Sequence, residues 1–132
     1  MNKPIAINIM PKWATICRSY TFEAAHYLPD LPKGHKCQRM HGHSYRVEVR
    51  ISGPVNAAGL VCNVEFGQID TIMEPILISV DHHVWNDKLE CPTVEHIASY
   101  LAQIVSKGLS VPVTMRVYEG PRSWAEVTYG DY

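Results

Sequence analysis

The chain has 132 residues, of which 46% are hydrophobic and 19% are charged, and its formal net charge is −1. This length predicts one domain over residues 1–132, with residues 1–14 as an N-terminal extension. The near-neutral charge gives no basic surface for nucleic acid or anionic membranes, and no segment is long and apolar enough to span a bilayer. Without a signal-peptide pattern, we expect a cytoplasmic protein whose four cysteines are free thiols.

The first third of the chain predicts β-structure. Residues from Ala14 to Leu28 favour a strand that leads into Phe22–His26 before a Pro/Gly loop. In HSYRVEVRIS apolar and polar residues alternate, which predicts a strand with one buried face. Gly53-Pro54 is expected to end this strand. The segment GLVCNVEF then predicts either a short third strand or an extended entry to a helix. The inward-facing residues of the second strand are Tyr45, Val47, Val49 and Ile51.

The middle of the chain predicts two helices. Apolar residues recur at spacings of three and four between Ile69 and Val80, although Pro75 is expected to kink or split this helix. The second helix is predicted to begin with Thr93 as its N-cap and to end at Gly108. The expected core-facing residues are Ile69, Ile72, Met73, Ile76, Leu77 and Val80 in the first helix and Val94, Ile97, Ala98, Leu101, Ile104 and Val105 in the second.

The last segments, VPVTMRVYE and SWAEVTYG, predict a β-hairpin with a turn at Gly120-Pro121. Strands and helices therefore come in runs and do not alternate strictly. This order indicates an α+β fold, in which an antiparallel sheet carries two helices on one face.

Two histidines, His41 and His43, stand at the beginning of the second strand. Side chains two residues apart on a strand point the same way, so both imidazoles should project from the apolar face. A buried polar group without a partner costs ~1–3 kcal/mol, and one metal ion would supply a partner for both rings. Zinc accepts three histidines and keeps a fourth position open in catalytic sites. The alternative is a turn-to-strand junction in which both rings bond to the backbone.

A metal site needs a third ligand, and His26 is the best candidate because strand pairing can bring it beside the other two. His35 lies in the Pro/Gly loop, and His96 lies within the second helix. Cys37, four positions before His41, has two interpretations. It could be a fourth ligand in a closed structural site, or a reactive thiol beside an open one, and the spacing leaves both open.

Acidic residues add two further candidates. Asp81 precedes His82 and could orient its imidazole, although Asp-His-His is also an ordinary polar loop. Glu119 continues the inward parity of its strand, so its carboxylate should lie on the buried face, where it needs a cationic or multi-donor partner. That partner would be an arginine of this protein or the NH/NH₂ edge of a ligand. Glu126, later in the hairpin, is a weaker rival.

Five segments together resemble the 6-pyruvoyltetrahydropterin synthase family, and within it the 6-carboxy-5,6,7,8-tetrahydropterin synthases: FEAAHYLP, GHKCQRMHGHSYRVEVRISG, VDHHVWND, PTVEHIA and RVYEGPRSWAEV. The resemblance implies a T-fold, in which ββααββ subunits assemble into an oligomeric barrel. It also implies roles for single residues. These are Zn²⁺ ligands at His26, His41 and His43, a catalytic thiol at Cys37, a relay pair at Asp81 and His82, a pterin anchor at Glu119, and a pterin-site position at Thr93.

The implied reaction converts 7,8-dihydroneopterin triphosphate to 6-carboxytetrahydropterin, acetaldehyde and triphosphate in queuosine biosynthesis. The implied assembly is a homo-oligomer with active sites at subunit interfaces. The three residues between Cys37 and His41 match this branch; the pyruvoyl branch, which keeps the side chain as a diketone, is the alternative. Lys33, Lys36 and Arg39 are candidate triphosphate contacts. Glu65 in place of an Asp, and Cys91 in place of an Asn, depart from the family pattern near the pocket.

Two other classes of protein share parts of this pattern. A cupin also combines a His-x-His pair with a glutamate, here Glu48, but Glu48 has the opposite parity and two mid-chain helices do not suit a small barrel. A non-catalytic zinc- or pterin-binding module would not need Cys37, Asp81 and His82 together.

Overall fold

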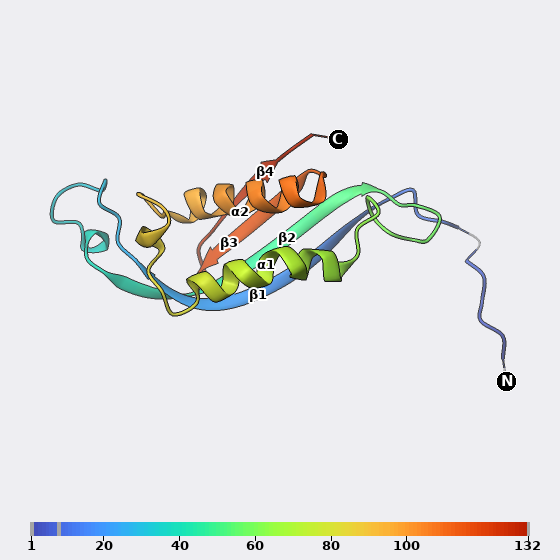
Figure 1. Cartoon of the computed structure of the whole chain (residues 1–132), viewed down its shortest axis with the longest axis horizontal. Helices are drawn as coiled ribbons and strands as arrows, with labels where there is room; N and C mark the ends of the chain where they lie inside the picture. The colour runs from blue at the N-terminus through green and yellow to red at the C-terminus, as the bar shows by residue number, and fades with distance from the viewer. Residues whose placement is uncertain (1, 8, 132) are drawn as a thin grey trace.

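The computed structural model describes residues 2–7 and 9–131 of the 132-residue chain. Its elements are β1 (Trp13–His26), β2 (His41–Pro54), α1 (Phe66–Val80), α2 (Val94–Leu109), β3 (Val113–Glu119) and β4 (Trp124–Tyr129), with short 3₁₀ turns η1 (Lys36–Gln38) and η2 (Trp85–Asp87). The predicted order of two strands, two helices and two strands is therefore confirmed (Figure 1). The expected N-terminal extension includes residues 1 and 8, which lie outside the described residues.

The four strands form one antiparallel sheet in the order β1-β2-β3-β4. β1 and β2 pair along their whole length, from Trp13 opposite Pro54 to His26 opposite His41. β3 then pairs with the middle of β2, from Tyr45 to Arg50, so that Glu119 lies opposite Tyr45. Because facing residues of paired strands project to the same side of a sheet, this register decides which side chains meet at the end of the sheet.

Both helices cover one face of the sheet, and the core lies between the two layers (Figure 1). The inward residues of β2 behave as predicted: Tyr45 is 1% exposed, and Val47, Val49 and Ile51 are 0% exposed. Each such aliphatic side chain contributes about 1.5–3 kcal/mol through burial. Near the end of the core, Phe22 stacks on Tyr45 with ring centroids 5.2 Å apart.

The opposite face of the sheet is polar and carries no helix. Glu48 lies there, as its parity predicts, and accepts hydrogen bonds from Arg46, Arg50 and Tyr118. Its carboxylate is thus matched by this protein's own donors on the side away from the histidines. That arrangement removes the residue that a cupin-like metal site would need.

Two predictions for the segment after β2 need correction. β2 does not end before Gly53-Pro54 but runs through Pro54, because Gly53 and Pro54 pair with the start of β1. The segment GLVCNVEF forms no strand; it contributes a single bridge between Val55 and Val61 and then turns into α1. Its alternative interpretation, an extended entry to a helix, is the closer one.

The two helices also differ from prediction in detail. α1 is not split at Pro75 but continues from Phe66 to Val80. Pro75 is exposed, so the carbonyl that loses its amide donor faces water, while the opposite stripe stays packed. In α2, Ala102 and Ser106 are buried and Ile104 only partly so.

α2 ends at Leu109, not at Gly108. The residue in the left-handed conformation that terminates it is Ser110, with φ 58° and ψ 39°. Gly108 remains helical, and a Cβ at this position would lie 2.6 Å from Ile72 Cδ1. The glycine therefore allows α1 and α2 to approach closely. The unfavourable left-handed conformation at the end of the helix is adopted by Ser110, which is not a glycine.

We expect Ser110→Gly to raise the free energy of unfolding by about 0.5–1 kcal/mol, because glycine adopts positive φ without the steric penalty of a side chain. Urea denaturation measures the change. The matched control is Ser99→Gly inside the same helix, which should lower stability by a similar amount. Equal effects of the two substitutions would contradict a left-handed strain at Ser110.

Candidate metal centre and its surroundings

Three histidines converge at the end of the β1–β2 pair. His26 is the last residue of β1 and lies opposite His41, while His43 lies opposite Ala24. One ligand-type atom from each of His26, His41 and His43 lies within 4.8 Å of the other two. The predicted convergence is therefore confirmed, and these three residues could hold one metal ion. His35 and His96 are not part of this group.

Backbone carbonyls fix the orientation of two of the rings. His26 Nδ1 lies 2.8 Å from the Pro92 carbonyl oxygen, and His41 Nδ1 lies 2.7 Å from that of Arg39. A carbonyl only accepts, so each Nδ1 carries a proton, and the lone pair of the neutral form of each ring would then lie on Nε2. A second hydrogen bond of this kind is a regular feature of metal-binding histidines.

Burial leaves part of the cluster without a protein partner. Within the described chain, the buried Nε2 atoms of His26 and His43 have no hydrogen-bond partner. Such atoms cost about 1–3 kcal/mol each. Burial also lowers the pKa of His26 and that of His43, with the Glu119 charge acting in the opposite direction. Both imidazoles therefore stay neutral at pH 7, and neutral imidazole is the form that binds a metal ion. The residues fit a metal site.

Glu119 ends β3 on the same face, as its parity predicts. Its carboxylate oxygens lie 3.4 Å from His43 Nε2 and 3.7 Å from His26 Nε2, and its side chain is 27% exposed. Within the described chain its carboxylate lies beside these neutral histidines and makes no salt bridge to an arginine. Glu126 is instead bonded to Arg116 on the other face. Glu119 is therefore the carboxylate that remains available to a ligand beside the cluster.

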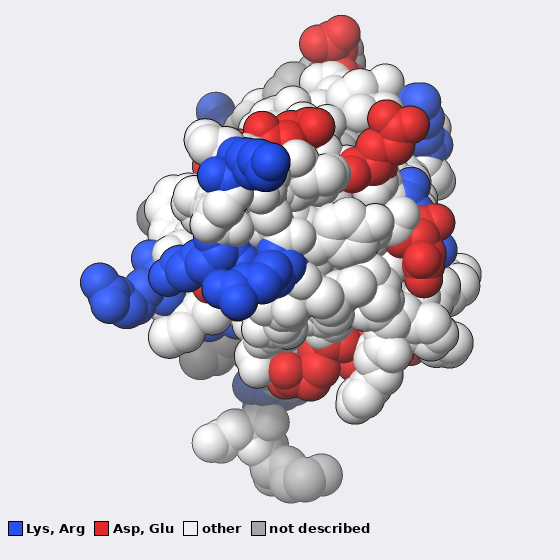
Figure 2. Space-filling view, turned by 90° about the vertical axis from the view of Figure 1, so that its left-hand side faces the viewer, with Lys and Arg blue, Asp and Glu red and all other residues white. Residues whose placement is uncertain are grey.

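A cavity of about 570 Å³ opens onto the cluster and contains Cys37. Cys37 lies in η1, is half-buried and is a free thiol. It does not join the group of possible metal ligands, which favours the thiol interpretation over the ligand interpretation. The lining residues are Lys36, Cys37, Arg39, Met40, His41, His43 and Glu119. Figure 2 faces this end of the molecule and shows basic side chains gathered mainly on one side of it.

Asp81 and His82 are in contact with each other but lie outside that cavity. Asp81 Oδ1 is 3.1 Å from His82 Nδ1 and accepts a hydrogen bond from the Glu23 amide. These two contacts lower the pKa of Asp81, the amide bond having the larger effect. His82 has a positive φ of 60° and a side chain that is 77% exposed. Strained backbone of this kind is often found at functional sites.

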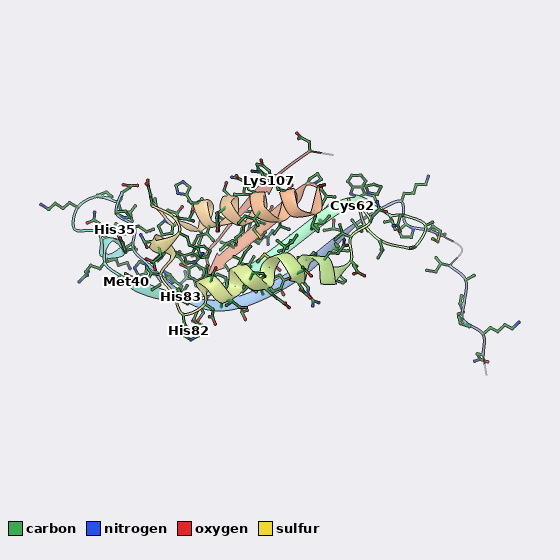
Figure 3. The ribbon with its side chains drawn as sticks, in the orientation of Figure 1. His35, Met40, Cys62, His82, His83 and Lys107 are labelled. Atoms are coloured by element: carbon green, nitrogen blue, oxygen red, sulfur yellow. The ribbon has the colours of Figure 1, made fainter. Side chains whose placement is uncertain are left out.

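His82, but not Asp81, lines a second cavity of about 430 Å³. His82, His83, Glu23, Gly42 and His43 are among its lining residues. His43 is the only described residue that lines both cavities. Figure 3 shows His82 and His83 in the left part of the view, below His35 and Met40. One copy of the chain thus does not place His82 in the cavity of Cys37.

Thr93 is confirmed as the N-cap of α2, where its side chain accepts a hydrogen bond from the His96 amide. It lines neither of the two cavities described above. Its neighbour Pro92 connects it to the cluster, because the Pro92 carbonyl binds the His26 ring.

Two aromatic residues near the cluster were given no role from the sequence: Tyr45, which contacts the cluster, and Trp85, which contacts Tyr45. The Tyr45 ring contacts those of His26 and His43, with centroids 6.1 and 5.8 Å apart. The Tyr45 hydroxyl and the Trp85 Nε1 are both buried without a described partner. The parity of Tyr45 already placed it on the histidine face, whereas nothing in the sequence indicated Trp85.

In the described chain, no helix has the length and apolar character required to cross a membrane.

Comparisons with known proteins agree with this geometry. A family model for 6-pyruvoyl tetrahydropterin synthase matches residues 15–129. A protein of Archaeoglobus fulgidus, named as a candidate 6-carboxy-5,6,7,8-tetrahydropterin synthase, is 38% identical over 111 residues, which cover 83% of this chain and 90% of that protein. The 6-carboxy-5,6,7,8-tetrahydropterin synthase of Synechocystis is 35% identical over 94 residues, covering 65% and 70% of the two chains.

A solved structure shows the same fold. The 6-pyruvoyl tetrahydropterin synthase of Caenorhabditis elegans superposes with a TM-score of 0.72 and 27% sequence identity, covering 93% of this chain and 98% of that one. The sheet of four strands with two helices on one face is thus shared with that enzyme.

We expect His41→Ala to lose its bound metal ion, because it removes one of three converging ligands. The loss of affinity should exceed the about 100-fold that removal of a ligand's hydrogen-bond partner can cost. Elemental analysis of the purified protein measures metal per chain. His96→Ala is the control, since His96 bonds to the Cys91 carbonyl away from the cluster. A His41→Ala protein that retains one ion per chain would rule out the three-histidine site.

Proposed function

This chain belongs to the 6-pyruvoyl tetrahydropterin synthase family, and from that premise we propose that it is a zinc-dependent 6-carboxy-5,6,7,8-tetrahydropterin synthase. It would convert 7,8-dihydroneopterin triphosphate to 6-carboxytetrahydropterin, acetaldehyde and triphosphate in queuosine biosynthesis. The observation that carries the proposal is one cavity in which Cys37 and Glu119 accompany two of the three convergent histidines. The relatives named for the same carboxy product support the choice of branch.

Zinc is the proposed metal because three convergent imidazoles with open access suit a catalytic zinc site. When bound, it would supply Lewis-acid polarisation of the hydroxylated side chain of the substrate. His26, His41 and His43 would hold it. The carbonyls of Pro92 and Arg39 keep two of those rings in the required orientation.

Glu119 would anchor the pterin. A carboxylate can accept two parallel hydrogen bonds from an amidine-like N–H/NH₂ edge, and pterins present such an edge. The carboxylate already lies within 4 Å of the histidine cluster. A pterin held by Glu119 would therefore place its side chain close to the metal and Cys37.

Cys37 and the Asp81–His82 pair would move protons. Cys37 shares the cavity with the cluster, so its thiol is the group placed to exchange a proton with the substrate side chain. Asp81 stays ionised because its pKa is lowered, and it would stabilise a protonated His82. Since His82 is exposed and lies outside the Cys37 cavity, we place it in the site of a neighbouring copy in a homo-oligomer.

A 6-pyruvoyltetrahydropterin synthase is the second candidate. The similarity to the Caenorhabditis elegans enzyme favours it. It would eliminate the triphosphate without cleaving the side chain, so the two reactions differ in one product, acetaldehyde.

The product experiment decides between them. Purified holoenzyme incubated with 7,8-dihydroneopterin triphosphate should release triphosphate and acetaldehyde in equal amounts, as measured by chromatography and mass spectrometry. Triphosphate without acetaldehyde would assign the pyruvoyl reaction. Release of neither product would identify a non-catalytic module.

Cys37→Ala should keep its zinc and its fold but lose about 10²–10⁴-fold in turnover, because it removes a proton-transfer group. Cys17→Ala, at an exposed thiol, is the control. Loss of zinc in Cys37→Ala would make Cys37 a ligand instead.

The shared site generates a complementation test. Cys37→Ala and His82→Ala should each be inactive alone, yet co-expressed mixed oligomers should recover activity, because some sites then combine an intact Cys37 with an intact His82 from another copy. Turnover of the doubly tagged, co-purified species measures the recovery. Mixed oligomers as inactive as their parents would place His82 in the site of its own chain.

A further inference from the structure

Glu119 differs from the other carboxylates of the sheet, because no donor of this chain is bonded to it. Glu48 and Glu126 each accept hydrogen bonds from arginines, and Glu23 accepts one from Ser44. Within the described chain, the Glu119 side chain makes no hydrogen bond, although only 27% of it is exposed. A carboxylate taken partly out of water needs a donor or a cation beside it. The chain itself therefore leaves this carboxylate unmatched.

The atoms that face the Glu119 carboxylate are ring nitrogens of two candidate metal ligands. Oε1 lies 3.4 Å from His43 Nε2, and Oε2 lies 3.7 Å from His26 Nε2. Because the Pro92 carbonyl binds Nδ1 of His26, the Nε2 atom of the neutral ring is an acceptor, as the carboxylate is. Two acceptors at this separation do not attract each other. A cation shared between them would bind both.

The two distances are also close to the spacing of ligand atoms around one zinc ion. Zinc binds imidazole nitrogen and carboxylate oxygen at about 2.0–2.2 Å in a tetrahedron, which separates neighbouring ligand atoms by about 3.3–3.6 Å. The Glu119 oxygens meet this spacing toward His43 and slightly exceed it toward His26.

A rotation of the Glu119 side chain is needed to complete the set. Glu119 is outside the group of ligand atoms that all lie within 4.8 Å of one another, which consists of the three histidines. The Glu119 amide is bonded to the Ser123 carbonyl, so the backbone is held while the side chain, which makes no hydrogen bond in the described chain, can turn. The carboxylate therefore has both the position and the freedom to become a ligand.

We propose, on the basis of the function proposed above, that Glu119 is a fourth metal ligand in the enzyme without substrate and leaves the metal to bind the pterin. Two parallel hydrogen bonds from an amidine-like N–H/NH₂ edge engage both oxygens of a carboxylate. Glu119 therefore cannot hold the pterin and close the metal site at the same time.

This exchange makes access to the metal site depend on the pterin. Without a pterin, Glu119 takes the fourth position and keeps other ligands out of it. A pterin edge draws the carboxylate away, and the position opens to the hydroxylated side chain of the same molecule, in the cavity that also contains Cys37. Molecules without such an edge do not open the site, so Glu119 contributes to substrate selection as well as to binding.

The visible absorption of the cobalt-substituted protein tests the ligand role, because the energies of the Co²⁺ bands depend on the ligand set. Glu119→Gln should shift these bands and lower the affinity for Co²⁺ by at least about tenfold. Glu126→Gln is the matched control, since Glu126 is bonded to Arg116 on the other face of the sheet. A loss of affinity with unchanged bands would mean that the carboxylate acts only through its charge, and would overturn the proposal. Unchanged affinity and unchanged bands would overturn it as well.

Unsubstituted pterin tests the exchange, because it carries the amidine-like edge but no hydroxylated side chain. Added to the cobalt-substituted wild-type protein, it should shift the Co²⁺ bands, and it should cause no shift in Glu119→Gln. Wild-type bands that stay constant while pterin binds would refute the exchange.

Pterin binding, followed by fluorescence on the same samples, separates this inference from the proposed function. If Glu119→Gln loses pterin binding but keeps the wild-type Co²⁺ bands, Glu119 is the pterin anchor and not a metal ligand. If Glu119→Gln binds pterin as tightly as the wild type, the anchor role fails, and the exchange fails with it.

Discussion

The candidate site depends on the antiparallel pairing of β1 with β2. Pairing over the full length of both strands sets His26 opposite His41 and His43 opposite Ala24, so that all three rings point to the same side of the sheet. β3 extends the same register and brings Glu119 opposite Tyr45. A slip of one residue would turn each of these side chains to the polar face. The apolar residues farther along β2 prevent that slip, because the same shift would expose Val47, Val49 and Ile51.

The cluster is costly for the protein when considered without a ligand. Buried imidazole nitrogens without partners, and a carboxylate beside them, do not stabilise a hydrophobic core. The surrounding structure maintains the arrangement: carbonyls hold two rings, and Tyr45, which itself packs against Phe22 and Trp85, contacts the rings of His26 and His43. Polar groups retained at such cost in an otherwise well-packed core favour a functional role. A bound metal ion would give these imidazole nitrogens coordination bonds in place of the missing hydrogen bonds.

The two ends of the molecule are organised for different contacts. At one end the cluster, Cys37 and Glu119 share a cavity, while the Asp81–His82 pair turns outward from it. At the other end the described N-terminal residues, 2–7 and 9–12, extend beyond the last pair of the β1–β2 ladder. A chain of 132 residues has little interior left for a closed pocket, so contacts between copies are a physically economical way to complete one.

Local patterns in the sequence determined the element order, the inward face of β2, the helical stripes and the residue types of the site, because the periods of strands and helices are properties of neighbouring residues. The same parity placed Glu119 with the histidines and Glu48 away from them. Helix and strand ends were less predictable: Gly53-Pro54, Pro75 and Gly108 are breakers by type, but pairing with β1, solvent exposure and contact with Ile72 decided their actual roles. Tertiary structure alone decided that His26 meets His41, that Pro92 orients His26, and that His82 does not share the cavity of Cys37. Those relations join residues distant in sequence, and only the packing of the sheet against its helices and loops fixes them.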